Sequence, residues 1–143
     1  MTTPTTTPFG PQLIGETEKT LNALLLRHLA EADVDGSLTE PEWVTLRVAS
    51  MLDGGVDRAV LVTAVSDRAH FPDAAQLVDD LTARGKLDDG QLTVAGTELL
   101  TRLQAAIAGD AGAIFGDLAP DDVAATERVL NELIARGRVA LAR

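Results

Sequence analysis

Cysteine and tyrosine are both absent from this chain of 143 residues. Without cysteine the protein can form no disulfide, no thiolate metal site and no thiol-based redox sensor. One tryptophan and three phenylalanines supply all the aromatic side chains, so the core must be built from Leu, Val, Ile and Ala. Because 45% of the residues are hydrophobic and helix formers are abundant, the composition predicts one compact, mainly α domain.

Positive charge is also scarce, with 12 Lys and Arg against 22 Asp and Glu and a net charge of −10. This balance argues against non-specific binding of nucleic acid, because phosphate contacts need Lys and Arg, but it does not exclude a local basic patch. No apolar run approaches the length that spans a membrane, and the start MTTPTTTPFGPQ lacks the features of a signal peptide. We therefore expect a soluble cytoplasmic protein in which residues 1–12 form a disordered tail.

Signatures of catalysis are missing as well. The two histidines, His28 and His70, are far apart in the sequence, and no metal-binding cluster, nucleophile motif or glycine-rich phosphate loop is present. The sequence therefore predicts a protein that is not an enzyme and that has no metal or cofactor. We expect His70, which precedes Phe71-Pro72, to serve in a turn or a helix cap.

Long helices are expected towards both ends of the chain. Apolar residues at helical spacing mark one helix over about residues 13–32 and another from Val94, whose end is left open by Gly109 and Gly112. A last helix should follow Pro120. Its apolar stripe holds Val123, Leu130, Ile134 and Leu141. The small middle of the chain cannot cover these apolar faces, so we predict an intertwined homodimer.

Two short helices are expected next to each other in the middle of the chain. A capping box of Thr39 and Glu42 predicts the start of the first, which should stop at residues 54–55. Asp57 should cap the second, over about residues 58–65. Its inward-facing residues are predicted to be Val60, Leu61 and Ala64.

The stretch from Pro72 to Leu100 indicates the architecture most clearly. A helix-period run begins near Pro72 and ends at Gly85, a very short hairpin pattern follows over residues 86–93, and another helical run starts at Val94. The Asp89-Gly90 pair at the hairpin tip is typical of a type I′ turn. A helix, a tight ribbon and a helix, preceded by a short helix, predict a winged helix-turn-helix with a short two-stranded wing.

The segments LVDDLTARGKL and LTVAGTELLTRL, with their Ala-Arg-Gly and Leu-Thr-x-Ala-Gly motifs, resemble the MarR family of bacterial transcription regulators. The resemblance covers roughly residues 13–142 and is most specific over 77–103. It implies a single MarR-like domain over residues 13–143, with a winged-helix lobe over about 39–100 and dimerisation helices over about 13–32 and 101–142. It also implies a homodimeric repressor that binds a pseudo-palindromic site in double-stranded DNA and responds to a small-molecule effector.

By this resemblance, the helix that ends at Gly85 is the recognition helix. Gln76 on its outward face could pair with adenine in the major groove, and Asp79 could accept a hydrogen bond from cytosine. The residues expected to contact DNA are Arg58, Arg68, Ala75, Gln76, Asp79, Thr82, Arg84, Lys86 and Gln91.

The charges of this region support an alternative. Between Pro72 and Thr93 there are five acidic residues and two basic ones, and Asp80 stands where relatives commonly have an arginine. Missing phosphate contacts lower affinity and weaken its dependence on salt. The alternative is a winged-helix dimer that has lost DNA binding and acts as an interaction or ligand-binding protein.

An effector site is predicted from His28, Trp43 and Arg47, since family members often bind phenolic or other small aromatic effectors between the dimerisation helices and the DNA-binding lobe. A cleft with one indole, one imidazole and one guanidinium could take an aromatic carboxylate. The other interpretation of His28 is a core or interface histidine.

Residues 31–42 carry a second, weaker alternative, because their pattern resembles an EF-hand calcium loop. Glu31, Asp33 and Asp35 stand at the first, third and fifth positions, Gly36 at the sixth and Glu42 at the twelfth. Against calcium, Glu31 replaces the usual first Asp, no second hand is visible, and Glu42 already has a capping role.

Overall fold

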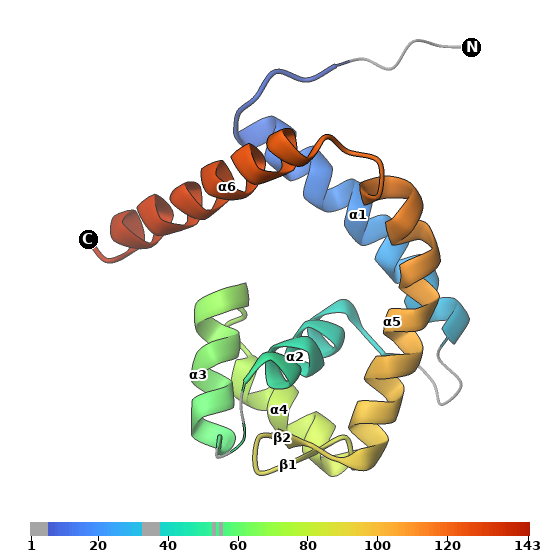
Figure 1. Cartoon of the computed structure of the whole chain (residues 1–143). Coiled ribbons are helices and arrows are strands. Elements are labelled where there is room, and N and C mark those ends of the chain that lie inside the picture. Colours follow the sequence, from blue (N-terminus) through green and yellow to red (C-terminus); the bar gives the residue numbers. More distant parts are fainter. Residues whose placement is uncertain (1–5, 33–37, 53, 55) are drawn as a thin grey trace. The chain divides into compact units, whose positions relative to one another are not determined.

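The computed structural model describes residues 6–32, 38–52, 54 and 56–143 of the chain. In order, the elements are α1 (Pro11–Ala32), α2 (Glu40–Met51), α3 (Arg58–Ala69), α4 (Ala74–Ala83), β1 (Leu87–Asp88), β2 (Gln91–Leu92), α5 (Val94–Phe115) and α6 (Pro120–Leu141) (Figure 1). They divide into two units, residues 1–107 and 108–143, with α5 crossing the boundary. The mainly α fold with a short two-stranded wing is as the sequence predicts.

Helix α2 begins with the predicted capping box. The Thr39 hydroxyl accepts a hydrogen bond from the Glu42 backbone N–H at 3.3 Å, and the Glu42 carboxylate accepts one from the Thr39 N–H at 3.0 Å. These two bonds satisfy N–H groups that have no partner within the helix. The helix ends at Met51 because Leu52 is extended, with φ −91° and ψ 135°, so it stops earlier than the predicted glycines at 54 and 55.

Helix α3 starts at its predicted cap and continues further than predicted. The Asp57 carboxylate accepts a hydrogen bond from the Val60 N–H at 2.9 Å. The helix runs to Ala69, four residues beyond the predicted end, and His70 closes it in the left-handed conformation with φ 58°. The prediction that Val60 faces inward was wrong, because Val60 is 48% exposed. Leu61 and Val65, one helical turn apart, are fully buried and define the inner face.

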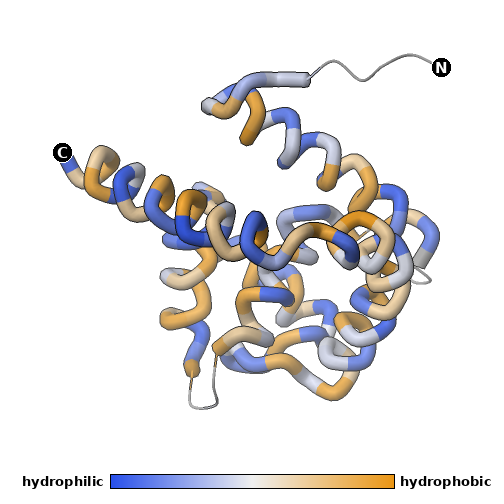
Figure 2. Tube along the Cα trace, turned by 45° about the horizontal axis from the view of Figure 1, so that its top comes forward, coloured by the Kyte–Doolittle hydropathy of each residue, from blue (hydrophilic) through white to orange (hydrophobic). Residues whose placement is uncertain are grey.

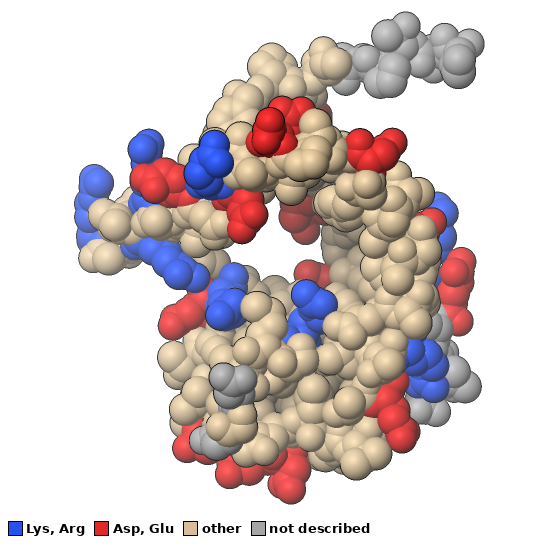
Figure 3. Space-filling model, viewed as in Figure 1, with Lys and Arg blue, Asp and Glu red and all other residues tan. Residues whose placement is uncertain are grey.

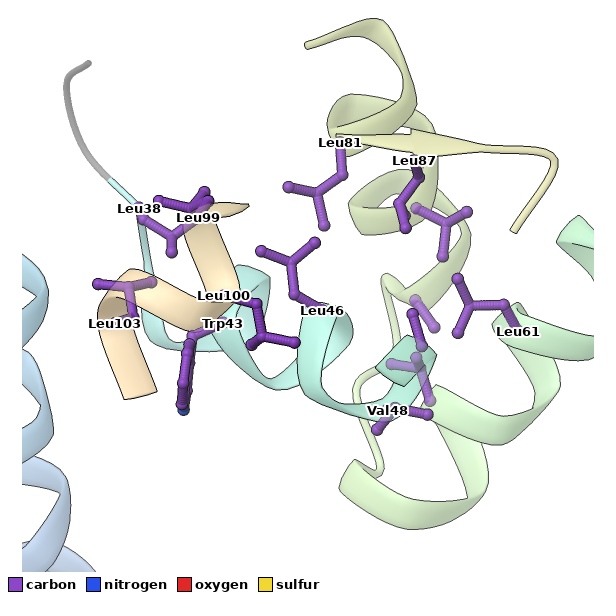
Figure 4. Packing of buried hydrophobic residues seen from close by; sticks show 14 of the residues in the cluster. Leu38, Trp43, Leu46, Val48, Leu61, Leu81, Leu87, Leu99, Leu100 and Leu103 are labelled. Atoms are coloured by element: carbon purple, nitrogen blue, oxygen red, sulfur yellow. The ribbon is translucent and has the colours of Figure 1, made fainter. Parts of the chain in front are cut away.

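The inner face of α4 is the one that the sequence predicts, and it belongs to the core of the first unit. Ala74, Leu77, Val78 and Leu81 are buried, and all but Leu77 join one cluster with residues of α2, α3, β1 and α5. The helix is shorter than predicted, since it begins at Ala74 rather than near Pro72. Figure 4 shows Leu81 and Leu87 beside Leu46 of α2. Each such leucine contributes about 1.5–3 kcal/mol through burial.

The wing is an antiparallel pair in which Leu87 lies opposite Leu92 and Asp88 opposite Gln91. Asp89 and Gly90 form the predicted turn, with φ values of 47° and 82°. Both central φ values are positive, as a type I′ turn requires.

The Leu-Thr-x-Ala-Gly motif joins the wing to α5. The Thr93 hydroxyl donates to the Gly85 carbonyl at 2.6 Å and accepts from the Gly96 N–H at 3.0 Å. The Thr93 N–H donates to the Lys86 carbonyl at 3.1 Å. A Cβ at Gly96 would overlap that same Lys86 carbonyl, so residue 96 must be glycine for the helix to approach the wing this closely. The motif therefore has a structural role.

Helix α5 continues through Gly109 and Gly112 as far as Phe115, which settles the end that the sequence leaves open. Helix α6 begins at Pro120 and carries Asp121 and Asp122 in its first turn, where the helix dipole favours acidic residues. Apolar residues recur along α6 between polar ones (Figure 2), and no residue of this helix is buried.

Candidate nucleic-acid interface

The outer face of α4 is open to solvent in the way that a recognition helix requires. Ala75, Gln76, Asp79, Thr82 and Ala83 are exposed, whereas the apolar residues between them are buried. This outward arrangement matches the prediction from helical periodicity. The polar groups on this face nevertheless make hydrogen bonds within the protein, which the sequence did not indicate.

Asp79 is paired with Arg58 of α3. Arg58 Nε donates to one carboxylate oxygen at 2.7 Å, and Arg58 Nη2 donates to the other at 3.0 Å. The hydrogen bond from Arg58 lowers the pKa of the Asp79 carboxyl. The same pair raises the pKa of Arg58. With both of its oxygens engaged, Asp79 is poorly placed to accept a hydrogen bond from cytosine.

Gln76 and Thr82 make shorter-range contacts on α4. Gln76 Nε2 donates to the Asp80 carboxylate at 2.7 Å, one helical turn away. This bond uses one of the two amide hydrogens and leaves the amide oxygen and the other hydrogen for a partner. The Thr82 hydroxyl donates to the Val78 carbonyl at 2.7 Å, within the helix itself.

Arg84 follows the last turn of α4 and points back into the unit. Its Nη1 is hydrogen-bonded to the Glu42 carboxylate, in a pair where Arg84 is 39% exposed and Glu42 only 10% exposed. Glu42 thereby joins the cap of α2 to the end of α4. The geometry favours a structural role for Arg84 over the predicted contact with DNA.

The wing tip is docked on the start of α3 and does not project freely. The Asp89 carboxylate accepts a hydrogen bond from the Arg58 N–H at 3.3 Å, and Gln91 Nε2 donates to the Val56 carbonyl at 3.1 Å. Gly90 lies so close to the Asp57 carbonyl that any side chain there would clash. Sequence reasoning missed this docking, because the partners are more than 30 residues apart.

Two of the predicted basic contacts have no acidic partner among the described residues. Arg68 is exposed in the last turn of α3, and Lys86 is half-buried at the base of the wing. Asp88 and Asp89 belong to the wing, and Figure 3 shows several acidic side chains gathered where the β1–β2 turn lies. The cations available for phosphate contacts are therefore few.

The predicted effector residues lie on α1 and α2 of the first unit. Trp43 is buried in the core cluster, and the exposed Arg47 stacks over its ring with the guanidinium carbon 5.9 Å from the ring centroid. That distance is near the limit for a cation–π contact. His28 is half-buried on α1, which contacts α2. Because the indole is enclosed, the exposed Arg47 is the member of the trio best placed to meet a ligand.

The EF-hand-like pattern falls mostly outside the described residues, since residues 33–37 are not among them. Its last position, Glu42, is described and has both carboxylate oxygens engaged. One accepts hydrogen bonds from Thr39 and the other from Arg84. A calcium ion would have to displace these contacts to obtain the bidentate carboxylate of an EF-hand.

Comparison with solved structures identifies the type of fold. The chain is similar to the PcaV transcriptional regulator from Streptomyces coelicolor, solved in complex with its natural ligand, with a TM-score of 0.60 and 22% identity over 90% of this chain and 96% of that one. It is also similar to BpsR from Bordetella bronchiseptica, whose DNA binding is regulated by 6-hydroxynicotinic acid, with a TM-score of 0.55 and 19% identity over 89% of this chain and 97% of that one. The chain has the MarR type of winged-helix fold.

Sequence comparison adds no further relative. No family model matches the chain, and no curated protein matches it either. PcaV is a transcriptional regulator, and BpsR is a protein whose DNA binding is regulated. None of the described helices is both long enough and apolar enough to cross a membrane.

Proposed function

We propose that this protein is a homodimeric, DNA-binding transcription regulator of the MarR type, acting as a repressor that a small molecule releases. The observation that carries the proposal is the exposed outer face of α4, held between α3 and a short wing in a fold shared with two regulators. In such folds the recognition helix enters the major groove, and its first residues meet the base edges. Here those residues are Ala75 and Gln76.

A dimer is supported by apolar side chains that the chain itself leaves uncovered. Val123, Leu130 and Ile134 of α6 are all at least 40% exposed, and Ile14 and Leu21 of α1 are also exposed. Large apolar surfaces of this kind mark protein interfaces. A two-fold dimer would present two copies of α4 to half-sites one helical turn apart, roughly 34 Å along the DNA.

The effector part of the proposal rests on His28, Trp43 and Arg47. PcaV was solved in complex with its natural ligand, and the DNA binding of BpsR is regulated by 6-hydroxynicotinic acid. We propose that an aromatic carboxylate binds at the exposed guanidinium of Arg47 and shifts the dimer towards a state with lower DNA affinity. Replacing both His28 and Arg47 by alanine should abolish the response to the effector. An unchanged response in that double variant would contradict this site.

The test of DNA binding is a selection from random duplex DNA with the purified protein at low salt. Enrichment of a pseudo-palindrome, with affinity that falls as salt rises, would support the regulator. Gln76→Ala serves as the matched variant, because it should lose preference at one symmetric pair of positions while still folding. A folded dimer that enriches no sequence would contradict the proposal.

The second candidate is a winged-helix dimer that does not bind DNA. It is favoured by a specific observation, namely that Arg58 and Arg84, two of the four predicted basic contacts, are paired with Asp79 and Glu42. The selection separates the two candidates, since this one predicts dimerisation without enrichment.

A further inference from the structure

The guanidinium of Arg58 is held on one side only. Its Nε and Nη2 donate to the two oxygens of Asp79, so this side of the planar group is fixed. The adjacent edge, formed by Nη1 and the second hydrogen of Nη2, meets no partner among the described residues. A guanidinium offers five N–H donors in a rigid fork, so one edge can be anchored while the other binds.

The Arg58–Asp79 pair lies at the surface beside the exposed face of α4, so the free edge of Arg58 is accessible to a ligand on that face. Asp79 lies on the exposed face of α4, one turn after Gln76. Arg58 is the first residue of α3, and its side chain extends to Asp79. Arg58 and Asp79 are 47% and 51% exposed, so the pair lies at the surface. The backbone N–H of Arg58 donates to Asp89 in the wing turn. Arg58 thus stands where the recognition helix, α3 and the wing meet.

We propose that Asp79 is a positioning residue that aims the free Nη edge of Arg58 at DNA. That edge would donate two parallel hydrogen bonds to a planar pair of acceptors, either O6 and N7 of a guanine or two oxygens of a phosphate. The inference rests on the proposed DNA-binding function and gives Asp79 a different role from the predicted contact with cytosine. It also explains how an acidic recognition helix could bind DNA, because the Arg58–Asp79 pair carries no net charge.

The alternative is that Asp79 weakens DNA binding, and it predicts the opposite change in DNA affinity when the charge of Asp79 is removed. If Asp79 only repels DNA, or withholds Arg58 from it, removing its charge should raise affinity. If Asp79 aims Arg58, removing its charge should lower affinity for the selected site, despite the loss of a repulsive carboxylate.

The experiment measures binding of the full-length chain to its selected duplex and to a random duplex, at several salt concentrations. The variants are Asp79→Asn, Arg58→Lys and Arg58→Ala, and the matched control is Asp80→Asn. The control removes one negative charge from the adjacent exposed position, where Asp80 accepts a hydrogen bond from Gln76 and meets no arginine among the described residues. Circular dichroism and thermal melting establish that each variant is folded.

We expect Asp80→Asn to bind the selected site at least as tightly as the parent. Asp79→Asn should bind it about 5- to 150-fold more weakly than the control, the range expected for one bidentate contact. If the acceptor is a guanine, Arg58→Lys should keep its affinity for random DNA but lose site preference, because an ammonium group cannot form the fork.

The pattern of loss identifies the acceptor. If Arg58→Ala loses preference for one guanine, the acceptor is the base. If it loses affinity for all sequences alike, with a salt slope smaller by about one, the acceptor is a phosphate. Either pattern supports the proposal when Asp79→Asn also binds the selected site more weakly than Asp80→Asn.

Two outcomes would overturn the inference and are easily told apart. If the parent binds DNA and Asp79→Asn binds as tightly as Asp80→Asn or more tightly, the positioning role fails while the proposed function stands. If the folded parent binds no DNA at low salt, the proposed function fails and the inference fails with it.

Discussion

Arg84 and Lys86 are close in sequence and have the same charge, yet the structure gives them different surroundings. Arg84 is bonded to the nearly buried carboxylate of Glu42, whereas Lys86 has no acidic partner among the described residues. Because Arg84 reaches a nearly buried carboxylate, its guanidinium would have to leave that carboxylate to contact a phosphate. The two residues should therefore respond differently to substitution.

We expect Arg84→Ala to lower the free energy of unfolding by about 1–3 kcal/mol, because the Glu42 carboxylate would lose its only charged partner among the described residues. Lys86→Ala should change stability by less than about 0.5 kcal/mol but reduce the salt slope of DNA binding by about one. Urea unfolding and salt titrations measure the two effects. A normal stability for Arg84→Ala, together with a reduced salt slope, would show that Arg84 contacts DNA after all.

The Arg58–Asp79 pair has a direct signature in solution. Arg58 lowers the pKa of the Asp79 carboxyl, so Arg58→Ala should raise that pKa towards its ordinary value. The stabilisation from this pair is present at neutral pH, above the ordinary pKa of the carboxyl, and is lost as the pH falls through the lowered one. Carboxyl chemical shifts followed by NMR against pH measure the change. An unchanged Asp79 titration in Arg58→Ala would mean that the pair does not form in solution.

At the scale of the elements, the wing and the start of α5 are packed in close contact. Gly96 lies so near the Lys86 carbonyl that any side chain must displace the backbone, whereas Gly109 and Gly112 of the same helix have open space around them. These contacts join residues at most ten positions apart, which explains why the Leu-Thr-x-Ala-Gly motif could predict the junction of the wing and α5.

Gly96→Ala should destabilise the protein by about 1–3 kcal/mol, through overpacking against the Lys86 carbonyl. The matched control is Gly109→Ala, which places the same methyl group in open space in the same helix and should stabilise it by about 0.5–1 kcal/mol. Thermal or urea unfolding of both variants measures the contrast. Equal effects at the two positions would contradict the close approach of α5 to the wing.

Local chemistry explains which elements could be predicted from the sequence. The capping box at Thr39, the cap at Asp57 and the Asp89-Gly90 turn depend on residues a few positions apart, and all three were predicted correctly. The inner face of α4 followed from periodicity in the same way. The end of α2 and the exposure of Val60 were missed, because they depend on what packs against each helix.

The candidate site was predictable in position but not in its contacts. Sequence reasoning identified the exposed residues of α4, since they follow from the helical period. It could not pair Arg58 with Asp79, or Arg84 with Glu42, because these partners are 21 and 42 residues apart. Contacts at such separations depend on the tertiary fold, which has no local signature.

At the scale of the whole molecule, the apolar stripe of α6 is open to solvent. Of its four predicted residues, three are at least 44% exposed and Leu130 is 40% exposed, and none is buried. Isolated exposed leucines are ordinary, but a repeated stripe along a 22-residue helix is typical of an interface.

We expect the double variant Leu130→Glu, Ile134→Glu to be monomeric at concentrations where the parent is a dimer, because a dimer would have to bury two charges per chain. Asn131→Glu is the control, since it adds a charge at an exposed polar position of the same helix. Sedimentation equilibrium measures the masses. A dimeric double variant would show that α6 does not form the interface.

The docked wing has a consequence for the order of folding. Its tip is tied to residues 56–58 by bonds that close loops of more than 30 residues, whereas the contacts within α3 and α4 are local. Long loops cost more entropy to close, so the ribbon should settle only after α3 and α4 have joined. The amide of Arg58, whose hydrogen is bonded to Asp89, should then exchange with solvent whenever the ribbon opens. Exchange rates at that amide would therefore report the opening of the wing while the rest of the unit remains folded.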